Sequence, residues 1–282
     1  MLQIGSLFSG AGLCDLGFHR AGFKHRWLCE IDPFCRSVLA RHWPGIPIYE
    51  DIRDIDPAKL PTVDVLAGGF PCQDVSCSGK RAGIRQDTRS GLWYEYARFI
   101  KEIQPRYAVI ENVRGLLSLG IETVLQDLAK IGYNAEWHVL SAADVGAPHR
   151  RERVFILAYP HSHQLNPVNG GLSSLIGDMG ESNKHHGYAD WNGIRLDRAS
   201  RAALREAYTR CVLHRVDDGC SQRLDGSGWG ISGRVMSISP TEYEAWLPRL
   251  KALGNGITPQ QAYFVARAIL RAEGFLVPDT YS

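Results

Sequence analysis

Short apolar runs alternate with amphipathic segments along residues 2–158. Apolar runs are typical of buried strands, whereas apolar residues repeated every three or four positions indicate one face of a helix. The alternation predicts an α/β protein with an open, mostly parallel sheet, whose functional sites lie beyond the carboxyl ends of the strands. The expected strands cover residues 2–8, 25–31, 46–49, 63–67, 107–110 and 154–158, and the expected helices cover residues 13–23, 33–42 and 92–103.

The regular alternation stops after this part of the chain. Residues 160–195 are rich in Gly, Asn, Ser and His and have weak periodicity, which is typical of irregular structure. Helical spacing of apolar residues returns at residues 260–271. We therefore expect three parts: a first domain over residues 1–158, a small irregular domain over 159–250, and a C-terminal segment over 251–282.

Composition excludes several classes of protein. Lys and Arg number 32 against 30 Asp and Glu, so the net charge of +2 gives no global sign of a nucleic-acid partner and any such sign must be local. The seven cysteines have no repeating spacing, which argues against a disulfide framework and leaves a chemical role open for one of them. No apolar stretch approaches the ~18–20 residues of a membrane span, and the start lacks the layout of a secretion signal. We expect a cytoplasmic protein without a membrane partner.

Glycines and carboxylates follow the first three expected strands. Gly10 and Gly12 follow the first strand, where glycine lets the backbone approach a cofactor closely. Glu30 lies near the end of the second strand, where its carboxylate could bind ribose hydroxyls, and Asp51 follows the third. The spacing is not the full G-x-G-x-x-G fingerprint, so an ordinary turn and a solvated loop carboxylate stay open.

Cys72 follows a buried strand and a rigid proline, which suits a nucleophilic thiol, although a buried structural cysteine is the commoner case. In the loop after it, residues 80–89 carry Lys80, Arg81, Arg85 and Arg89 against one acidic residue, Asp87. Such a loop could close over a polyanion, or it could be an ordinary solvated loop.

Further charged side chains flank the last two expected strands. Glu111 and Asn112 follow the strand over 107–110, and Arg151 and Arg153 lead into the strand over 154–158. In extended geometry the two arginines share one face, where paired guanidinium groups suit phosphate or carbonyl oxygens. The alternative is a surface salt-bridge cluster with Glu152.

Seven short segments of the chain resemble, in their order and approximate spacing, the motifs of the DNA cytosine-5 methyltransferases. The resemblance covers about residues 1–158 and 248–272. The stretch over 76–92 is similar to the bacterial and phage branch of that family. The resemblance implies a Rossmann-like S-adenosylmethionine-dependent methyltransferase sheet, with a target-recognition domain in the irregular region. The segments are Phe8-Ser9-Gly10-Ala11-Gly12, Glu30, Asp51-Ile52, Gly69-Phe70-Pro71-Cys72-Gln73, Glu111-Asn112-Val113, Arg151-Glu152-Arg153-Val154 and Gly254-Asn255-Gly256.

The resemblance implies methyl transfer from S-adenosylmethionine to C5 of a flipped-out cytosine in a specific duplex DNA sequence. Cys72 would attack C6 as a thiolate and form a covalent intermediate. Glu111 would protonate or hydrogen-bond N3 and the exocyclic amine, and Arg153 would hold O2. Arg151 is the other arginine of the catalytic set, and Asn112 would order the loop.

The resemblance also assigns cofactor and DNA contacts. Phe8 would stack on the adenine, the backbone at Gly10 and Gly12 would approach the cofactor, and Glu30 would bind the ribose. The remaining cofactor contacts would come from Ile31, Asp51, Ile52, Leu92 and Asn255. The residues expected to contact DNA are Ser76, Ser78, Lys80, Arg81, Arg85 and Arg89.

The same residues also bear on the protein's partners, on a metal and on alternative activities. We expect a monomer that acts on double-stranded DNA, alone or beside a restriction endonuclease specific for the same site. The His and Cys residues after 160 raise the question of zinc, but only Cys211 and His214 have even half of a ligand spacing, so no metal is expected. An RNA cytosine methyltransferase would share the chemistry. A nicotinamide-dependent oxidoreductase would explain the glycine turn alone, and a non-catalytic DNA-binding protein would usually lack Cys72 or Glu111.

Overall fold

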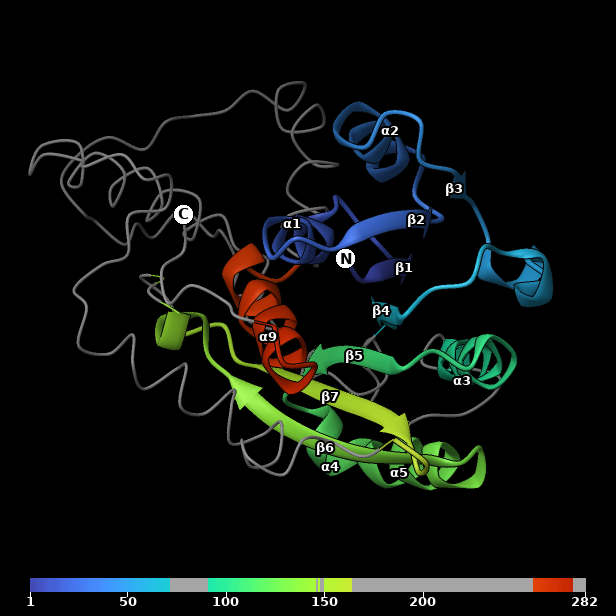
Figure 1. The fold of residues 1–282 in the computed structure, drawn as a ribbon. Helices are drawn as coiled ribbons and strands as arrows, with labels where there is room; N and C mark the ends of the chain where they lie inside the picture. The colour runs from blue at the N-terminus through green and yellow to red at the C-terminus, as the bar shows by residue number, and fades with distance from the viewer. Residues whose placement is uncertain (72–90, 146, 148–149, 164–255, 276–282) are drawn as a thin grey trace, which may run out of the picture.

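The structure is a computed structural model, which describes residues 1–71, 91–145, 147, 150–163 and 256–275. Seven strands within these ranges form one sheet in the order β3-β2-β1-β4-β5-β7-β6 (Figure 1). Strands β1 to β5 run parallel, whereas β7 pairs antiparallel with both β5 and β6. The predicted α/β fold is confirmed. The strands are β1 Gln3–Leu7, β2 Lys24–Cys29, β3 Ile48–Tyr49, β4 Val65–Gly69, β5 Tyr107–Val113, β6 Tyr133–Leu140 and β7 Arg153–Pro160.

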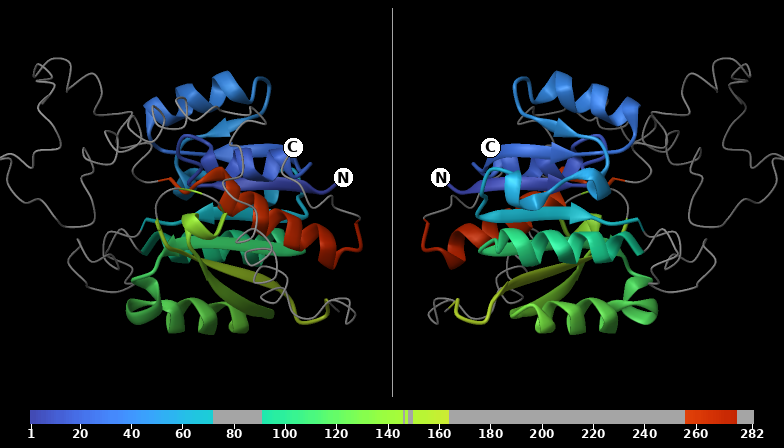
Figure 2. Two further views of the ribbon diagram at one scale, coloured as in Figure 1. Left: turned by 90° about the vertical axis from the view of Figure 1, so that its left-hand side faces the viewer. Right: turned by 90° about the vertical axis from the view of Figure 1, so that its right-hand side faces the viewer.

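Helices cover both faces of the sheet (Figure 2). In one view α9 lies in front of the sheet, and in the opposite view α3 and α5 lie in front of it. Along β5, Tyr107 and Val109 pack in the core on the α1 and α9 side, and Ala108 and Ile110 pack on the opposite side. This alternation follows from the two-residue period of a strand, and it explains why the central strands are apolar throughout. The helices are α1 Leu13–Arg20, α2 Pro33–His42, α3 Leu92–Ile103, α4 Leu116–Leu119, α5 Ile121–Lys130 and α9 Pro259–Ala272.

Several elements differ from the expectations drawn from the sequence. Helices α2 and α3 begin and end where they were predicted. Strand β5 continues to Val113, so Glu111 and Asn112 lie within the strand and not after it. Strand β6 and the helices α4 and α5 were not predicted. Strand β6 forms an edge of the sheet and alternates irregularly between buried and exposed residues, with Trp137 48% exposed, so it has no apolar run to reveal it.

Helix α9 returns the chain to the sheet and packs along α1 (Figure 1). Its residues from Gln260 to Ile269 are all buried, and its apolar side chains share one core with residues of α1, β4, β5 and β7. The expected boundary at 158/159 falls within β7, which continues to Pro160, whereas the boundary at 250/251 lies outside the described ranges; the division into three parts stays a prediction. None of the described helices is long and apolar enough to cross a membrane.

Gly17 marks the closest approach of α1 to α9. A Cβ atom at this position would lie 2.3 Å from the carbonyl oxygen of Pro259, 2.6 Å from Cβ of Ala262 and 2.7 Å from the backbone nitrogen of Tyr263. Backbone atoms cannot move aside as a flexible side chain can, so the two helices require glycine here.

We expect Gly17→Ala to lower the free energy of unfolding by about 1–3 kcal/mol, because the added methyl group overpacks the helix contact. Helix propensity alone would raise stability by up to about 1 kcal/mol, so the two effects have opposite signs. Urea unfolding of both proteins measures the difference. An unchanged or higher unfolding free energy in the variant would mean that α1 and α9 do not pack this closely.

Candidate active site

The turn between β1 and α1 exposes its backbone at the carboxyl edge of the sheet. Phe8, Gly10 and Gly12 all have positive φ angles, of 54°, 56° and 81°. Such a conformation is uncommon for a phenylalanine and marks a constrained turn. The turn is held by hydrogen bonds from Ser9 N to Cys29 O at 3.0 Å and from Gly12 N to Ser9 O at 2.9 Å. Among the described residues, apart from Gly10 and its two chain neighbours, no atom lies within 4 Å of the place that a Cβ of Gly10 would take, so this part of the structure leaves open space beside the backbone.

Glu30 joins the ends of β1 and β2 at this turn. Its Oε2 accepts a hydrogen bond from Gly10 N at 2.7 Å, and its Oε1 accepts one from Asp32 N at 2.8 Å. Burial raises the pKa of Glu30, and the N–H groups of Asp32 and Gly10 oppose that rise. The next residue, Ile31, is 62% exposed although it is apolar. A carboxylate, an open glycine backbone and an exposed apolar side chain together suit a nucleoside.

The other expected cofactor residues of the described chain lie in different surroundings. The carboxylate of Asp51 accepts hydrogen bonds from Arg53, whose guanidinium lowers the pKa of Asp51. Ile52 is buried in the core, and Leu92 is half-buried at the start of α3. Arg98 on α3 donates a hydrogen bond to Ile52 O at 3.0 Å and so fixes this turn. That contact was not predicted, because an arginine on a helix gives no sign of a main-chain partner distant in sequence.

Glu111 and Arg153 form a largely buried ion pair across β5 and β7. Arg153 Nε lies 3.0 Å from Glu111 Oε1, and the two side chains are only 10% and 15% exposed. Burial raises the pKa of Glu111, and the guanidinium groups of Arg153 and Arg151 oppose that rise. A Cβ at Gly69 would lie 2.3 Å from Glu111 Oε2, so glycine at the end of β4 makes room for the carboxylate. Glycine within a strand often marks such a close approach, and this signal could have identified Gly69 from the sequence.

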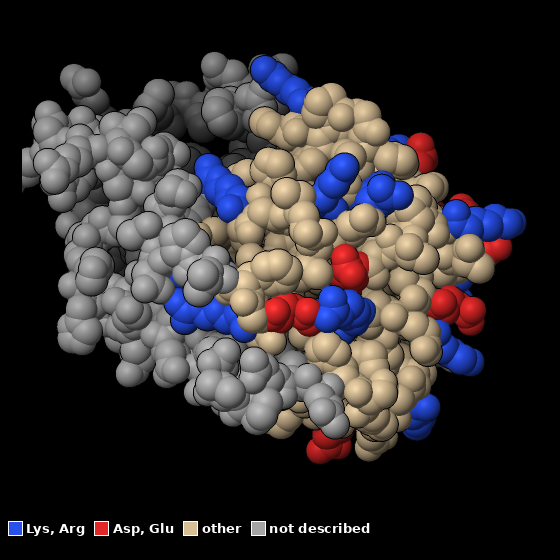
Figure 3. Space-filling model, in the orientation of Figure 1, with Lys and Arg blue, Asp and Glu red and all other residues tan. Residues whose placement is uncertain are grey.

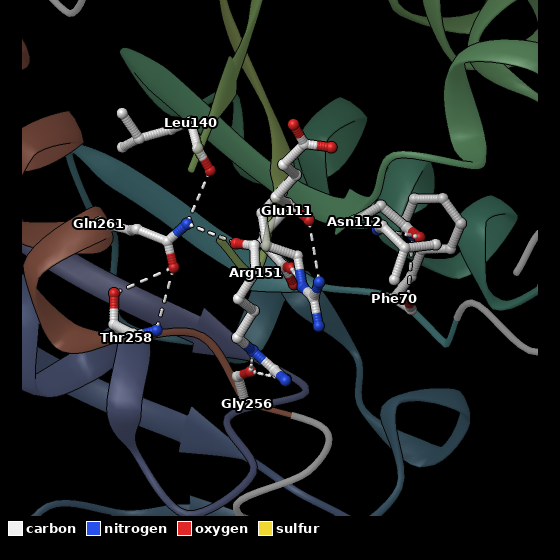
Figure 4. Close-up of polar contacts among 11 residues, drawn as sticks. Phe70, Glu111, Asn112, Leu140, Arg151, Gly256, Thr258 and Gln261 are labelled. Carbon is white, nitrogen blue, oxygen red and sulfur yellow. Dashed lines mark hydrogen bonds and ion pairs between the residues drawn. The ribbon is translucent and has the colours of Figure 1, made fainter. Parts of the chain in front are cut away.

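Asn112 anchors the chain that leads out of β4. Its buried amide donates a hydrogen bond from Nδ2 to Phe70 O at 3.1 Å and accepts one from Val113 N at 2.9 Å (Figure 4). Phe70 lies two residues before Cys72 in the sequence. The amide therefore fixes the last described residues before the expected nucleophile.

Arg151 and Arg153 have different partners. Arg151 has a φ of 20°, so it is not in the extended conformation expected from the sequence. Its guanidinium donates to the carbonyl of Gly256, from Nε at 2.8 Å and also from Nη2 (Figure 4). Glu152, the partner considered from the sequence, forms an ion pair with Arg114 at 2.7 Å. Arg151 thus connects the start of β7 to the segment that precedes α9.

Several expected site residues lie outside the described ranges, and the structure says nothing of their positions. On the face of the molecule in Figure 3, basic and acidic side chains of the described residues are interspersed, without a large region of one sign. In the described ranges, no group of three or more His, Cys, Asp and Glu residues is placed to hold a metal ion. The expected site residues outside the described ranges are Cys72, Ser76, Ser78, Lys80, Arg81, Arg85, Arg89 and Asn255.

Comparison with curated proteins identifies similar sequences. A family model described as C-5 cytosine-specific DNA methylase matches residues 2–191. The type II methyltransferase M.FnuDI of Fusobacterium nucleatum is 39% identical over 162 residues, which cover 56% of this chain and 47% of that protein. The alignment therefore spans about half the length of M.FnuDI. The type II methyltransferase M.NgoMIV of Neisseria gonorrhoeae is 29% identical over 305 residues, covering 94% of this chain and 96% of that protein.

Solved structures share the fold. The S. pombe Dnmt2 methyltransferase is similar with a TM-score of 0.63 at 17% identity, covering 98% of this chain and 100% of that one. At this identity the similarity concerns the fold alone. Because the family model covers well over half of the sequence, the chain belongs to the C-5 cytosine-specific DNA methylase family.

Proposed function

We propose that this protein transfers a methyl group to C5 of a cytosine in a specific sequence of duplex DNA. The observation that carries the proposal is the buried Glu111–Arg153 pair, 3.0 Å apart at the carboxyl edge of the sheet. It combines a carboxyl group of raised pKa with a guanidinium that is always charged. A cytosine ring offers matching partners, since its N3 and exocyclic amine face one side and its O2 lies beside N3.

The chemistry requires negative charge on the pyrimidine ring to be relieved. The thiolate of Cys72 adds to C6, and the electron pair of the C5–C6 double bond becomes available at C5. That pair would form the bond to the methyl carbon as the bond between this carbon and the sulfonium sulfur breaks and leaves its electron pair on sulfur. Glu111 supplies a proton or a hydrogen bond at N3, and its raised pKa favours the protonated form that can do so. Arg153 donates to O2, where negative charge also develops. The C5 proton then passes to a base such as water, the electron pair of the C5–H bond re-forms the C5–C6 double bond, and the C6–S bond breaks to release the thiolate of Cys72.

Delivery of the base requires that it leave the duplex. C5 and C6 of a stacked cytosine are not accessible to a side chain, so the base is flipped out at a cost of a few kcal/mol. Asn112 holds Phe70 and thereby the chain that leads to Cys72. The basic loop after Cys72 contacts the DNA backbone, and residues 159–250 recognise the target sequence.

S-adenosylmethionine fits the residues of the β1–α1 turn. The open space at Gly10 allows close approach, Glu30 can bind ribose hydroxyls, and Phe8 and Ile31 offer apolar contact to an adenine. Leu92 and Asn255 would complete the set, and Asp51 with Ile52 would contact the adenine amino group. When bound, S-adenosylmethionine supplies an electrophilic methyl group. The protein's own contribution is to hold that group beside the base pocket and to exclude water.

The biological setting follows from the same proposal. M.FnuDI and M.NgoMIV are both described as type II methyltransferases. We place this protein in the same role, as a monomer that modifies bacterial or phage DNA in the cytoplasm. It acts alone or beside a restriction endonuclease that cuts the same sequence.

Cys72→Ser is expected to lower methyl transfer by about a thousandfold or more, because a serine hydroxyl is a far weaker nucleophile than a thiolate. The measurement is transfer of tritium from labelled S-adenosylmethionine to duplex DNA, with RNA in a parallel reaction. Cys77→Ser is the matched control, since it removes a thiol from the same loop and should retain activity. Label at C5 of cytosine in RNA but not in DNA would contradict the proposed substrate. Covalent trapping of Cys72→Ser on DNA containing 5-fluorocytosine would show that a residue other than Cys72 is the nucleophile.

Glu30→Ala is expected to weaken S-adenosylmethionine binding by roughly tenfold to a hundredfold, because it removes a charged hydrogen-bonding group and releases the Gly10 backbone. Isothermal titration calorimetry measures the dissociation constant. Glu50→Gln is the control, because Glu50 follows the neighbouring strand and its side chain is 73% exposed. Equal affinities for Glu30→Ala and wild type would show that the cofactor binds elsewhere.

The pKa of Glu111 predicts how stability depends on pH. Its pKa is raised above the ordinary value of 4.5 in the folded protein, so the folded state holds this proton more tightly than the unfolded chain does. The stabilisation is fully present below about pH 4.5 and is lost as pH rises through the folded-state pKa. The unfolding free energy of wild type minus that of Glu111→Gln should therefore fall as pH rises from 4.5 toward 8. Urea unfolding across this range, with the exposed Glu122→Gln as control, provides the curves; parallel curves for wild type and Glu111→Gln would contradict the raised pKa.

A further inference from the structure

Gln261 is a fully buried amide in the first turn of α9. Its Nε2 donates to Leu140 O at 2.7 Å and to Arg151 O at 3.2 Å, and its Oε1 accepts from Thr258 N at 3.1 Å and Thr258 Oγ1 at 3.0 Å (Figure 4). A glutamine amide has two N–H donors and an oxygen with two acceptor sites. All of the hydrogen-bonding capacity of Gln261 is therefore used.

These bonds join chain segments that come together only in the fold. Leu140 ends β6 and lies opposite Arg153 in the register of β6 and β7. Arg151 lies two residues before Arg153, and Thr258 lies two residues after Gly256. A single buried amide thus connects the start of α9 to the main chain just before Arg153 and to the residue opposite Arg153 on β6.

The backbone at Arg151 needs such support. Its φ of 20° is unfavourable for a residue with a side chain, and conformations of this kind persist only where surrounding contacts hold them. The carbonyl of Arg151 is held by Gln261, and its guanidinium is held by the carbonyl of Gly256. The same turn sends the chain back toward β5, where Arg153 meets Glu111.

We propose that Gln261 is a positioning residue for methyl transfer. Through the carbonyls of Leu140 and Arg151 it fixes the turn that precedes β7, and thereby the guanidinium of Arg153 against Glu111. It acts through these residues and does not itself touch the base. This inference rests on the proposed function, since it assigns Arg153 and Glu111 to the base pocket.

The neighbouring Gln260 provides a matched control. It lies in the same turn of α9 and is also buried, but its Oε1 has no hydrogen-bond partner in the part of the chain that the structure describes. Methionine has nearly the length and volume of glutamine and lacks its amide. Gln261→Met therefore removes the bonds to Leu140, Arg151 and Thr258, whereas Gln260→Met changes a buried amide that makes none of them.

We expect Gln261→Met to lower kcat for DNA methylation by about tenfold to a hundredfold, and Gln260→Met to stay within about threefold of wild type. The pH profile gives a readout that a loss of packing would not change. Arg153 opposes the raised pKa of Glu111, so a less constrained Arg153 should move the Glu111 limb of the profile to higher pH. The part of the profile of kcat against pH that reports Glu111 is identified as the part that is absent in the profile of Glu111→Gln.

A second variant distinguishes the hydrogen bonds that the amide donates from those that it accepts. Gln261→Glu, when ionised, keeps the acceptor that Thr258 uses and loses both donors to the carbonyls of Leu140 and Arg151. It should lose activity as Gln261→Met does, although its contacts to Thr258 remain. It also serves if Gln261→Met does not fold.

Several outcomes would overturn the proposal. Equal losses of kcat in Gln261→Met and Gln260→Met would show that Gln261 contributes only to packing. A Glu111 part of the pH profile that does not move would show the same. Wild-type activity of Gln261→Glu would show that the loss of kcat in Gln261→Met does not come from the hydrogen bonds that Gln261 donates. If wild type itself transfers no methyl group, the proposed function fails instead. Carbon-13 NMR titration of the Glu111 carboxyl in wild type and Gln261→Met would still test the positioning, since an identical pKa in both would contradict it.

Discussion

The ion pair between Glu111 and Arg153 depends on the antiparallel pairing of β5 with β7. The five parallel strands β1 to β5 bring their carboxyl ends to one edge of the sheet, but Arg153 begins a strand that runs the other way. Only an antiparallel neighbour can place its first residue beside the end of β5. Removing two charges from water costs several kcal/mol per ion, and their attraction offsets this only with good geometry. The glycine at 69 and the chain turn at Arg151 are the local features that make this geometry possible.

Helix α9 stabilises the site from a distant part of the sequence. At one side it contacts α1, which follows the glycine turn, and near its start it contacts the turn that precedes β7. The capping box between Thr258 and Gln261 begins the helix, and the same Gln261 amide reaches across to the sheet. The end of the helix is tied to β5 as well, because Glu273 accepts a hydrogen bond from the hydroxyl of Tyr107 at 2.8 Å. Residues of α9 are therefore part of the same core as residues of β1, β4, β5 and β7.

Local chemistry explains what could be predicted from the sequence. Helix α2 was predicted from its apolar face and from Pro33, which suits a first helical turn. The structure adds its cap, since Asp32 accepts a hydrogen bond from Phe34 N at 2.8 Å. Apolar runs predicted Glu30 near the end of one strand and Glu111 just after another, and Glu111 lies within the last residues of β5. Long-range contacts could not be read in this way. The conformation of Arg151 depends on Gly256 and Gln261, more than a hundred positions later in the sequence, and the bonds of Gln261 follow from tertiary packing, not from helical periodicity.

The described site has two halves, and one segment joins them. Gly10 and Glu30 form the half suited to a nucleoside, whereas Glu111 and Arg153 form the half suited to a pyrimidine. Arg151 is linked to the second half by its charge, which opposes the raised pKa of Glu111, and its guanidinium bonds to the carbonyl that follows the expected cofactor residue at 255. Two residues farther on, the chain presents Arg153 to the base pocket. A displacement of this segment would therefore disturb both halves together, which is what a reaction between a bound cofactor and a bound base must avoid, since small errors in the distance between reacting atoms cost large factors in rate.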